Sequence, residues 1–204
     1  MSILKISYYI CHVKSNITPK ERILETATRL FYSQGYNSTG INQILDEANV
    51  AKASLYQHFG SKEDLGIEYI KKVREDWFAS FELHLSKKNN PKQKILVAFD
   101  FLEINMRLHN FKGCRFLNLL SDIDSTSNAM QTEILEHKTK LRKLFKKLVD
   151  EHTADTKKEL STPNASDIIY LLFEAAIIES KVYKDTWCIA SAKKAATSIL
   201  ETST

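Results

Sequence analysis

The segment 48–62 holds the residues whose types and spacing suggest chemistry most clearly. Between its ends it contains no acidic residue, and Ser54, Tyr56, Gln57 and His58 lie close together within it. These side chains can form hydrogen bonds to base edges or phosphates, and a DNA major groove is wide enough for an α-helix. A short helix that is polar, free of negative charge and held rigidly by its neighbours therefore suits a nucleic-acid surface.

Three short helices are expected to position this segment. Thr18 can cap a helix over 19–34, and Gly35 would end that helix. A second helix is expected over 41–48 and a third over 52–59. Asn49 stands between them, where a sharp turn often needs positive φ and Asn substitutes best for Gly.

The third helix is expected to have one buried side, formed by Leu55 and Phe59. Gly60 would end it, and Ser61 with Asp64 resembles a capping box for a further helix reaching about Ser86. That helix is long enough to connect the first part of the chain to the rest.

The remainder of the chain also shows helical periodicity. Only 5 Gly and 3 Pro occur among the 204 residues, so few tight turns are available and an all-α fold is predicted. Further helices are expected over 91–109, within 113–120, and over 128–152, 163–183 and 186–200. The basic segment 137–147 is interpreted as a solvated helix face.

The expected helix 163–183 has almost no polar side, which predicts burial all round. A second copy of the chain would cover it, so a homodimer through a four-helix bundle of the last two helices is predicted. The alternative is a core helix within one subunit. The predicted interface residues are Ile168, Leu172, Ala176, Ile178, Ala192, Ala196 and Ile199.

Composition narrows the class of protein further. The net charge of +4 neither proves nor opposes a nucleic-acid partner, and acidic and basic residues nearly balance in the first 65 residues. Three separated cysteines form no zinc pattern and indicate a reduced cytoplasmic protein.

No apolar run suits a membrane span, and no phosphate loop or nucleophile motif indicates an enzyme. No metal or cofactor is expected.

Residues 55–65 (LYQHFGSKEDL) are similar to the signature of the TetR family of transcriptional regulators. Residues 23–36 (ILETATRLFYSQGY) and 44–50 (ILDEANV) match the same family in order and spacing, so the resemblance covers about 19–69. One departure is Asn49, where the family usually has Gly. Asn tolerates the same backbone conformation.

The resemblance implies an all-α dimeric repressor that binds palindromic operator DNA and is released by a small molecule. It implies DNA contacts along the third helix and beside it, at Thr39, Lys52, Ala53, Ser54, Tyr56, Gln57, His58 and Lys62. Gln57 and Ser54 would meet base edges, whereas Tyr56, Lys62 and Thr39 would hold phosphates.

For three of these residues, the alternative to a DNA contact is an ordinary role in the folded protein. Tyr56 could be a half-buried core aromatic, although Leu55 and Phe59 already supply the core. His58 could be solvated instead of contacting the DNA backbone. Lys62 could be an ordinary surface lysine, although it stands in the first turn of a helix, where backbone amides also face anions.

A small-molecule site is expected among helices of the C-terminal part, because bundle interiors hold ligands. The candidates are Trp77, Phe81, Phe101, Asn105, Met106, His109, Asn118, Phe173 and Glu174. A charged Glu174 within an apolar helix would need a partner, either across the dimer or on a cationic ligand. Cys114 is interpreted as a small buried residue, with a redox role as the alternative.

The predicted organisation is a disordered arm over 1–17, a helix-turn-helix DNA-binding domain over 18–65, and a ligand-binding and dimerisation domain over 66–204. The predicted function is a TetR-like repressor with operator DNA, a second copy and an unknown inducer as partners. The alternative is a helical interaction protein of the same fold that no longer binds DNA.

Overall fold

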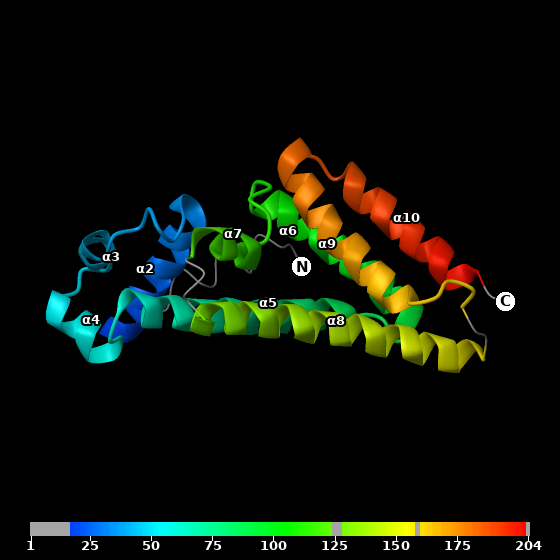
Figure 1. The fold of residues 1–204 in the computed structure, drawn as a ribbon, viewed down its shortest axis with the longest axis horizontal. Helices are drawn as coiled ribbons and strands as arrows, with labels where there is room; N and C mark the ends of the chain where they lie inside the picture. Colours follow the sequence, from blue (N-terminus) through cyan, green and yellow to red (C-terminus); the bar gives the residue numbers. More distant parts are fainter. Residues whose placement is uncertain (1–16, 124–127, 158–159, 203–204) are drawn as a thin grey trace. The chain divides into compact units, whose positions relative to one another are not determined.

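The chain forms two compact units in the structure, a computed structural model that describes residues 17–123, 128–157 and 160–202. The first unit ends at Tyr69 and the second begins at Ile70, so the division falls within the 24-residue helix α5 (Lys62–Leu85). Every regular element of the described residues is a helix (Figure 1), which confirms the all-α prediction. The predicted arm, 1–17, lies outside the described residues except for Ile17.

The N-terminal unit contains α2 (Pro19–Gln34), α3 (Ile41–Ala48), α4 (Lys52–His58) and the start of α5. The expected caps of α2 are present. The Thr18 hydroxyl accepts from the Glu21 amide at 3.2 Å, and the Glu21 carboxylate accepts from the Thr18 amide at 2.7 Å. Gly35 ends the helix with φ of 95°, a conformation that a side chain would strain.

The core of this unit is formed by apolar residues from all four helices. Ile23, Ile44, Leu55 and Leu65 are each fully buried. At the end of α2, the Phe31 ring packs edge-on against Tyr69, with 5.3 Å between the ring centroids. Side chains from the other three helices of the unit therefore hold α4 in place.

In the residues that the structure describes, the C-terminal unit contains the rest of α5 and five further helices. These are α6 (Pro91–Leu108), α7 (Arg115–Asp122), α8 (Asn128–Thr156), α9 (Ala165–Tyr183) and α10 (Trp187–Glu201). The last two helices run side by side in opposite directions (Figure 1). Within the described residues, no helix combines the length and the apolar character that crossing a membrane requires.

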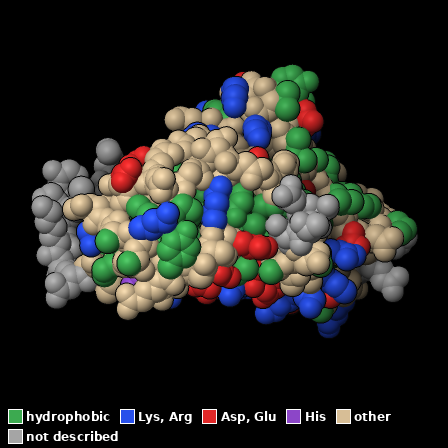
Figure 2. Space-filling model, turned by 60° about the vertical axis from the view of Figure 1, so that its left-hand side comes forward, with side chains coloured by type: hydrophobic (Ala, Val, Ile, Leu, Met, Phe, Trp, Pro, Cys, Tyr) green, Lys and Arg blue, Asp and Glu red, His purple; other side chains and the backbone are tan. Residues whose placement is uncertain are grey.

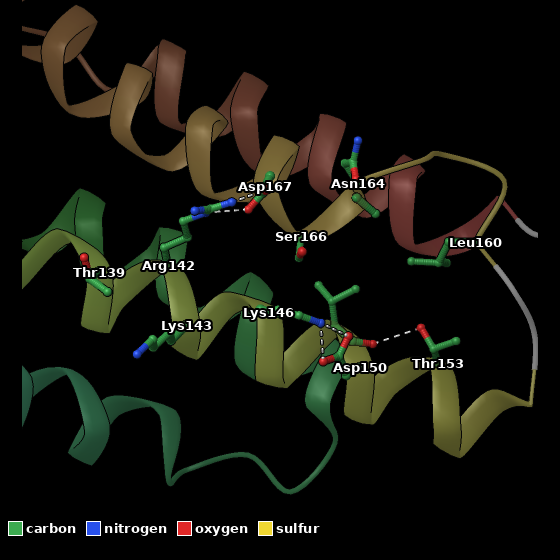
Figure 3. Close-up of a pocket in the computed structure, with 12 residues that line it drawn as sticks. Thr139, Arg142, Lys143, Lys146, Asp150, Thr153, Leu160, Asn164, Ser166 and Asp167 are labelled. Atoms are coloured by element: carbon green, nitrogen blue, oxygen red, sulfur yellow. Dashed lines mark hydrogen bonds and ion pairs between the residues drawn. The ribbon is translucent and has the colours of Figure 1, made fainter.

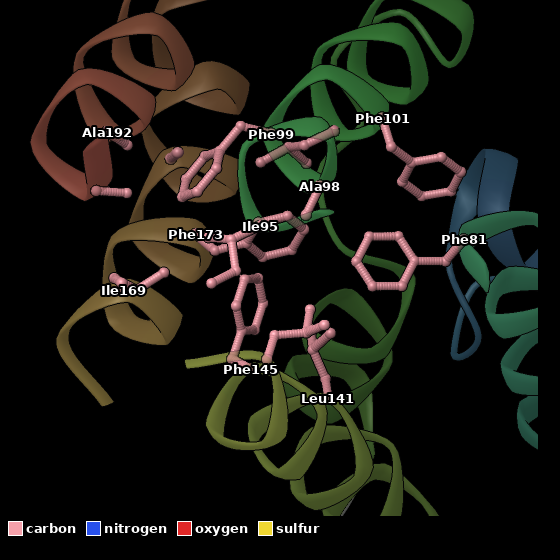
Figure 4. Close-up of a cluster of buried hydrophobic side chains, with 14 of the residues drawn as sticks. Phe81, Ile95, Ala98, Phe99, Phe101, Leu141, Phe145, Ile169, Phe173 and Ala192 are labelled. Carbon is pink, nitrogen blue, oxygen red and sulfur yellow. The ribbon is translucent and has the colours of Figure 1, made fainter. Parts of the chain in front are cut away.

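Large aromatic side chains fill the core of the C-terminal unit (Figure 4). Phe81, Phe99, Phe145 and Phe173 come from four different helices, and none is more than 1% exposed. The Phe173 ring lies 5.3 Å from Phe145 and 5.6 Å from Phe99, between centroids. Such close packing of rings stabilises the contact between α9 and the helices beneath it.

The prediction that 137–147 is a solvated face was wrong. His137 is only 2% exposed, and Leu141 and Phe145 are buried in the core. The reason is the repeat of four residues, which places these three side chains on one face of α8 while the lysines between them point elsewhere. A smaller difference concerns α9, which begins at Ala165 because Asn164 before it has φ of 54°.

Candidate nucleic-acid interface

The helix α4 presents a polar surface on a fixed support. Leu55 has no exposure and Phe59, just after the helix, has 2%. Tyr56 is 53% exposed, so its side chain does not belong to the core. The remaining exposed residues of the helix are Lys52, Ala53, Gln57 and His58, while Ser54 is half-buried. The surface carries no acid, as the sequence predicted.

The turn before α4 has the expected left-handed backbone. Asn49 has φ of 52° and ψ of 56°, and its amide bonds back to the end of α3. The Arg22 guanidinium of α2 donates to the Asn49 carbonyl at 3.2 Å. The crossing of α3 and α4 is thus held by a hydrogen bond from a third helix.

Two acidic side chains near the interface already have partners. Glu47 of α3 accepts from Arg29 and from Gln43, and these bonds lower the pKa of its carboxyl. Asp64 of α5 accepts from the Ser61 hydroxyl at 2.8 Å. Carboxylates engaged in this way oppose an approaching phosphate less than free ones would.

Lys62 stands at the first position of α5 and is half-buried. Its Nζ lies over the ring of Tyr36, 4.5 Å from the centroid. Burial, with a contribution from the charge of Glu63, raises the pKa of Tyr36 to about 12, so the phenol is neutral at ordinary pH. The ammonium therefore faces an uncharged ring.

Thr39 does not have the exposure that a phosphate contact needs. Its relative exposure is 0%, its hydroxyl donates to the Gly35 carbonyl at 2.6 Å, and it also accepts from Gln34 Nε2 at 3.2 Å. The expected phosphate contact through this hydroxyl is therefore corrected to a structural role. The side chain connects the end of α2 to the start of α3.

The predicted small-molecule residues of the C-terminal unit fall into two groups. The apolar members, Phe81, Phe101, Met106 and Phe173, are buried in the shared core. Trp77 packs against that core, stacked on Phe81 with 4.5 Å between the rings. These five residues are brought together, as a ligand site would require.

The polar members mostly bond to their own surroundings. The Asn105 amide donates to the Phe101 carbonyl, and His109 Nδ1 lies 3.2 Å from the Asn105 carbonyl. Asn118 donates to the Lys112 carbonyl at 2.9 Å. These contacts hold the end of α6 and the loop before α7.

Glu174 has its partner within the same subunit. Its Oε2 accepts from Lys138 Nζ of α8, and neither side chain is more than 16% exposed. Cys114 is half-buried, and its Sγ lies 3.5 Å from the same Nζ. The sequence analysis did not identify Lys138, because a lysine in a basic segment gives no sign of burial.

His137 is a second residue that the sequence analysis missed. It stacks on Phe116 with 3.6 Å between the rings and also packs against Trp77. Burial, with the positive charges of Lys138, Arg74 and Lys140, lowers the pKa of His137 to about 3. The signal that could have found it is its spacing of four from Leu141.

An open groove of about 530 Å³ lies between α8 and the start of α9 (Figure 3). Arg142 and Asp167 face each other across it through two hydrogen bonds of 2.7 Å. Its lining includes none of the predicted small-molecule residues. The groove therefore differs from the predicted ligand site, although Val149 and Ala165 in its lining also belong to the hydrophobic core.

The predicted interface residues differ in their exposure. Ala176, Ala192 and Ala196 are buried within one subunit, whereas Ile178 is 49% exposed. The others are half-buried, namely Ile168, Leu172 and Ile199. The helix predicted to be buried all round is therefore covered on one side only within a single subunit.

Exposed apolar residues follow the other side of α9. Leu171, Ile178 and Val182 are 61%, 49% and 67% exposed, and Ala175 lies between them. Their spacing of three and four residues places them on one helix face. Hydrophobic side chains also gather where α9 ends and α10 begins, at the top of Figure 2.

Comparison with known proteins finds a family model in the N-terminal unit and relatives that match over different lengths of the chain. The family model for bacterial regulatory proteins of the tetR family matches residues 23–69. The transcriptional regulator LmrA of Bacillus subtilis (strain 168) is 53% identical over 57 residues, which are 28% of this chain and 30% of LmrA. The transcriptional repressor DhaR of Mycobacterium sp. (strain GP1) is 24% identical over 168 residues, 81% of this chain and 84% of DhaR.

Further matches include a third relative and two solved structures. The negative transcriptional regulator IcaR of Staphylococcus epidermidis is 30% identical over 123 residues, 58% of this chain and 60% of IcaR. SCO4454, a TetR-family regulator from Streptomyces coelicolor, has a TM-score of 0.78 at 22% identity and covers 89% of this chain and 94% of its own. Reduced NemR of E. coli has a TM-score of 0.75 at 21% identity, and the match covers 89% of this chain and 97% of the NemR chain.

The fold and the site define a helix-turn-helix regulator with a second, larger helical unit. The N-terminal unit belongs to the TetR family of transcriptional regulators, whose family model matches residues 23–69.

Proposed function

We propose that this chain is a ligand-responsive repressor that binds palindromic operator DNA as a homodimer in the cytoplasm and is released by a small molecule. The observation that carries the proposal is the surface of α4, which is polar, free of acids and supported by Leu55 and Phe59. Two relatives, DhaR and IcaR, are named as a repressor and a negative regulator, which supports repression.

In this proposal Gln57 and Ser54 meet base edges, while Tyr56 and Lys62 contact phosphates. Base-edge contacts determine sequence preference, and phosphate contacts determine affinity and register. Lys52, Ala53 and His58 complete the surface. Thr39 acts indirectly, because its buried hydroxyl holds the start of α3.

A second copy of the chain would cover the exposed face of α9. Leu171, Ala175, Ile178 and Val182 form this face, and α10 lies beside it. Two α4 helices about 34–36 Å apart would then read successive turns of one DNA face. The dimer is necessary because a single seven-residue helix offers few contacts.

The aromatic core of the C-terminal unit is the proposed place for an inducer. Trp77, Phe81, Phe101 and Phe173 supply an apolar surface, and Glu174 supplies a buried acceptor, since its Oε1 has no partner in the described residues. Binding would release DNA only if the ligand favours a conformation with lower DNA affinity. No step of this function requires catalysis by the chain.

The experiment that tests the proposal measures binding of the purified protein to the DNA upstream of its own gene, over a series of salt concentrations. A random DNA library is selected in parallel. We expect saturable binding that weakens steeply with salt, and a selected site with two-fold symmetry. Absence of binding to both DNAs would favour a helical interaction protein of the same fold.

Substitutions in α4 test the site itself. Gln57→Ala should weaken binding to the selected site by at least about 30-fold, as loss of a base contact worth ~1–3 kcal/mol from each subunit would do, and relax preference at one position of each half-site. Tyr56→Ala should weaken binding to all sequences alike. The matched control is Gln93→Ala, which changes an exposed glutamine in α6 and should leave binding unchanged.

A further inference from the structure

The contact between Lys62 and Tyr36 joins the start of α5 to the segment that follows α2. Lys62 Nζ lies 4.5 Å from the centroid of the Tyr36 ring. This distance is within the ~6 Å at which the negative face of an aromatic ring attracts a cation. The contact therefore attracts the ammonium group to a defined place beside the DNA-binding helix.

Packing holds the ring that receives this cation. Tyr36 is 8% exposed, and its centroid lies 4.9 Å from that of Phe31. Phe31 in turn packs edge-on against Tyr69. The Tyr36 carbonyl also accepts from the Thr39 amide at 3.2 Å. In the free protein, the ring is thus fixed through its side chain and its main chain.

A lysine that binds phosphate normally loses the freedom of a long, flexible stem. Lys62 is half-buried with its ammonium over a fixed ring, so part of that freedom is already lost in the free protein. The carboxylate of nearby Asp64 accepts from the Ser61 hydroxyl at 2.8 Å, in the cap of the same helix. Preorganisation of this kind increases affinity without adding any new contact.

We propose that Tyr36 is a positioning residue for DNA binding, whose ring face holds the Lys62 ammonium where a backbone phosphate meets it. The inference rests on the proposed function, in which Lys62 contacts phosphate. The ring provides the attraction and the hydroxyl does not. Phenylalanine is therefore an adequate replacement at position 36, and an aliphatic residue is not.

The test uses the full chain and its selected operator DNA. Position 36 is replaced by phenylalanine and by phenylalanines with increasing numbers of ring fluorines, which weaken the negative ring face while nearly keeping its shape. We expect Tyr36→Phe to bind like the wild type. The Kd should then rise stepwise with fluorination, by about two- to five-fold in all. Thermal unfolding of each variant checks that the fold is retained.

A second series in a Lys62→Met background separates positioning from packing. Lys62→Met should weaken binding and reduce the slope of log K against log salt by about 1.8, as expected when each subunit of the dimer loses one phosphate contact. In that background, fluorination should have no further effect. Lys140→Met is the matched control, since its Nζ lies 4.1 Å from the Phe78 ring in the other unit and should not affect DNA binding.

Two outcomes would overturn the positioning role while leaving the proposed function intact. One is a constant Kd across the fluorinated series when Lys62→Met itself weakens binding. The other is an equal rise in Kd with and without Lys62, which would show that the ring acts only through packing. Failure of the wild-type protein to bind any DNA would overturn both proposals.

A measurement on the free protein adds an independent result. The methylene protons of Lys62 next to Nζ should be shifted upfield in the NMR spectrum by the Tyr36 ring current. The shift should be lost in Tyr36→Leu and retained in Tyr36→Phe. Unshifted protons in the wild type would contradict the proposal.

Discussion

Lys138 of α8 and Glu174 of α9 form a salt bridge in which both side chains are largely buried, at 16% and 13% exposure. Burial alone would lower the pKa of Lys138, but the neighbouring Cys114 and Glu174 outweigh that effect and raise it. One ammonium group thus connects the residue before α7 to α8 and α9.

Breaking this pair should be costly. Lys138→Met would leave a carboxylate buried without its partner, so we expect the free energy of unfolding to fall by about 3–5 kcal/mol in urea titrations. The double variant Lys138→Met/Glu174→Leu should recover most of that loss. The control is Lys146→Met, whose pair with Asp150 is about 60% exposed and should be worth less than about 1 kcal/mol. Equal losses in the two single variants would contradict the prediction.

His137 should make the protein sensitive to acid. Burial lowers its pKa in the folded state to about 3, against 6.5 for the ordinary value. Between these values the unfolded chain binds more protons, so the stabilising contribution is complete above pH 6.5 and is lost as the pH falls toward 3. The loss approaches about 1.4 kcal/mol per pH unit well below 6.5.

A phenylalanine in place of His137 removes the titrating group and keeps a ring against Phe116. Unfolding of His137→Phe should therefore depend less on pH between 6.5 and 4 than unfolding of the wild type, as measured by denaturant midpoints across that range. His58→Gln is the control, because His58 is exposed. An unchanged pH dependence in His137→Phe would show that other groups are responsible.

Asn49 should tolerate glycine but not alanine. Its φ of 52° is left-handed, a conformation that costs an ordinary L-residue about 1–2 kcal/mol. We expect Asn49→Ala to lower the free energy of unfolding by about 1 kcal/mol and Asn49→Gly to leave it nearly unchanged, as measured by chemical denaturation. Asn42→Ala, at an exposed position within α3, should cost nothing. The prediction fails if alanine and glycine behave alike at position 49.

A charge on the exposed face of α9 should prevent pairing of two copies. Leu171 is 61% exposed in one subunit, and Leu171→Glu would place an unpaired carboxylate in the proposed interface. We expect the dimer to dissociate at least about tenfold more readily, as measured by light scattering during size-exclusion chromatography. Leu135→Glu, at 65% exposure on α8, is the matched control and should remain dimeric. A monomeric wild type would contradict the proposed dimer.

The local features of the N-terminal unit were predictable because they depend on near neighbours in the chain. Thr18 caps α2 as expected, and Asn49 takes the left-handed turn that its side chain tolerates. Leu55 is buried because helical spacing places it opposite the polar residues of α4. These predictions are confirmed.

The predictions were wrong where a polar residue contacts another element, because the spacing of residues along one helix does not reveal such contacts. Thr39 appeared available for phosphate, yet its hydroxyl is fully buried and bonded to Gly35. His137 was assigned to a solvated face, although Phe116 covers it. Polarity predicts exposure only when no other element approaches the residue.

The sequence by itself determined the helices, their caps and the acid-free segment 48–62, because hydrogen bonds and side-chain spacing within one helix are local. Only the tertiary structure decided that Glu174 pairs with Lys138 and that Lys62 lies over Tyr36. Residues far apart in the chain meet in these contacts, and their geometry depends on how whole helices pack. The same packing leaves one face of α9 exposed within one subunit, and the sequence analysis expected a second copy to cover it.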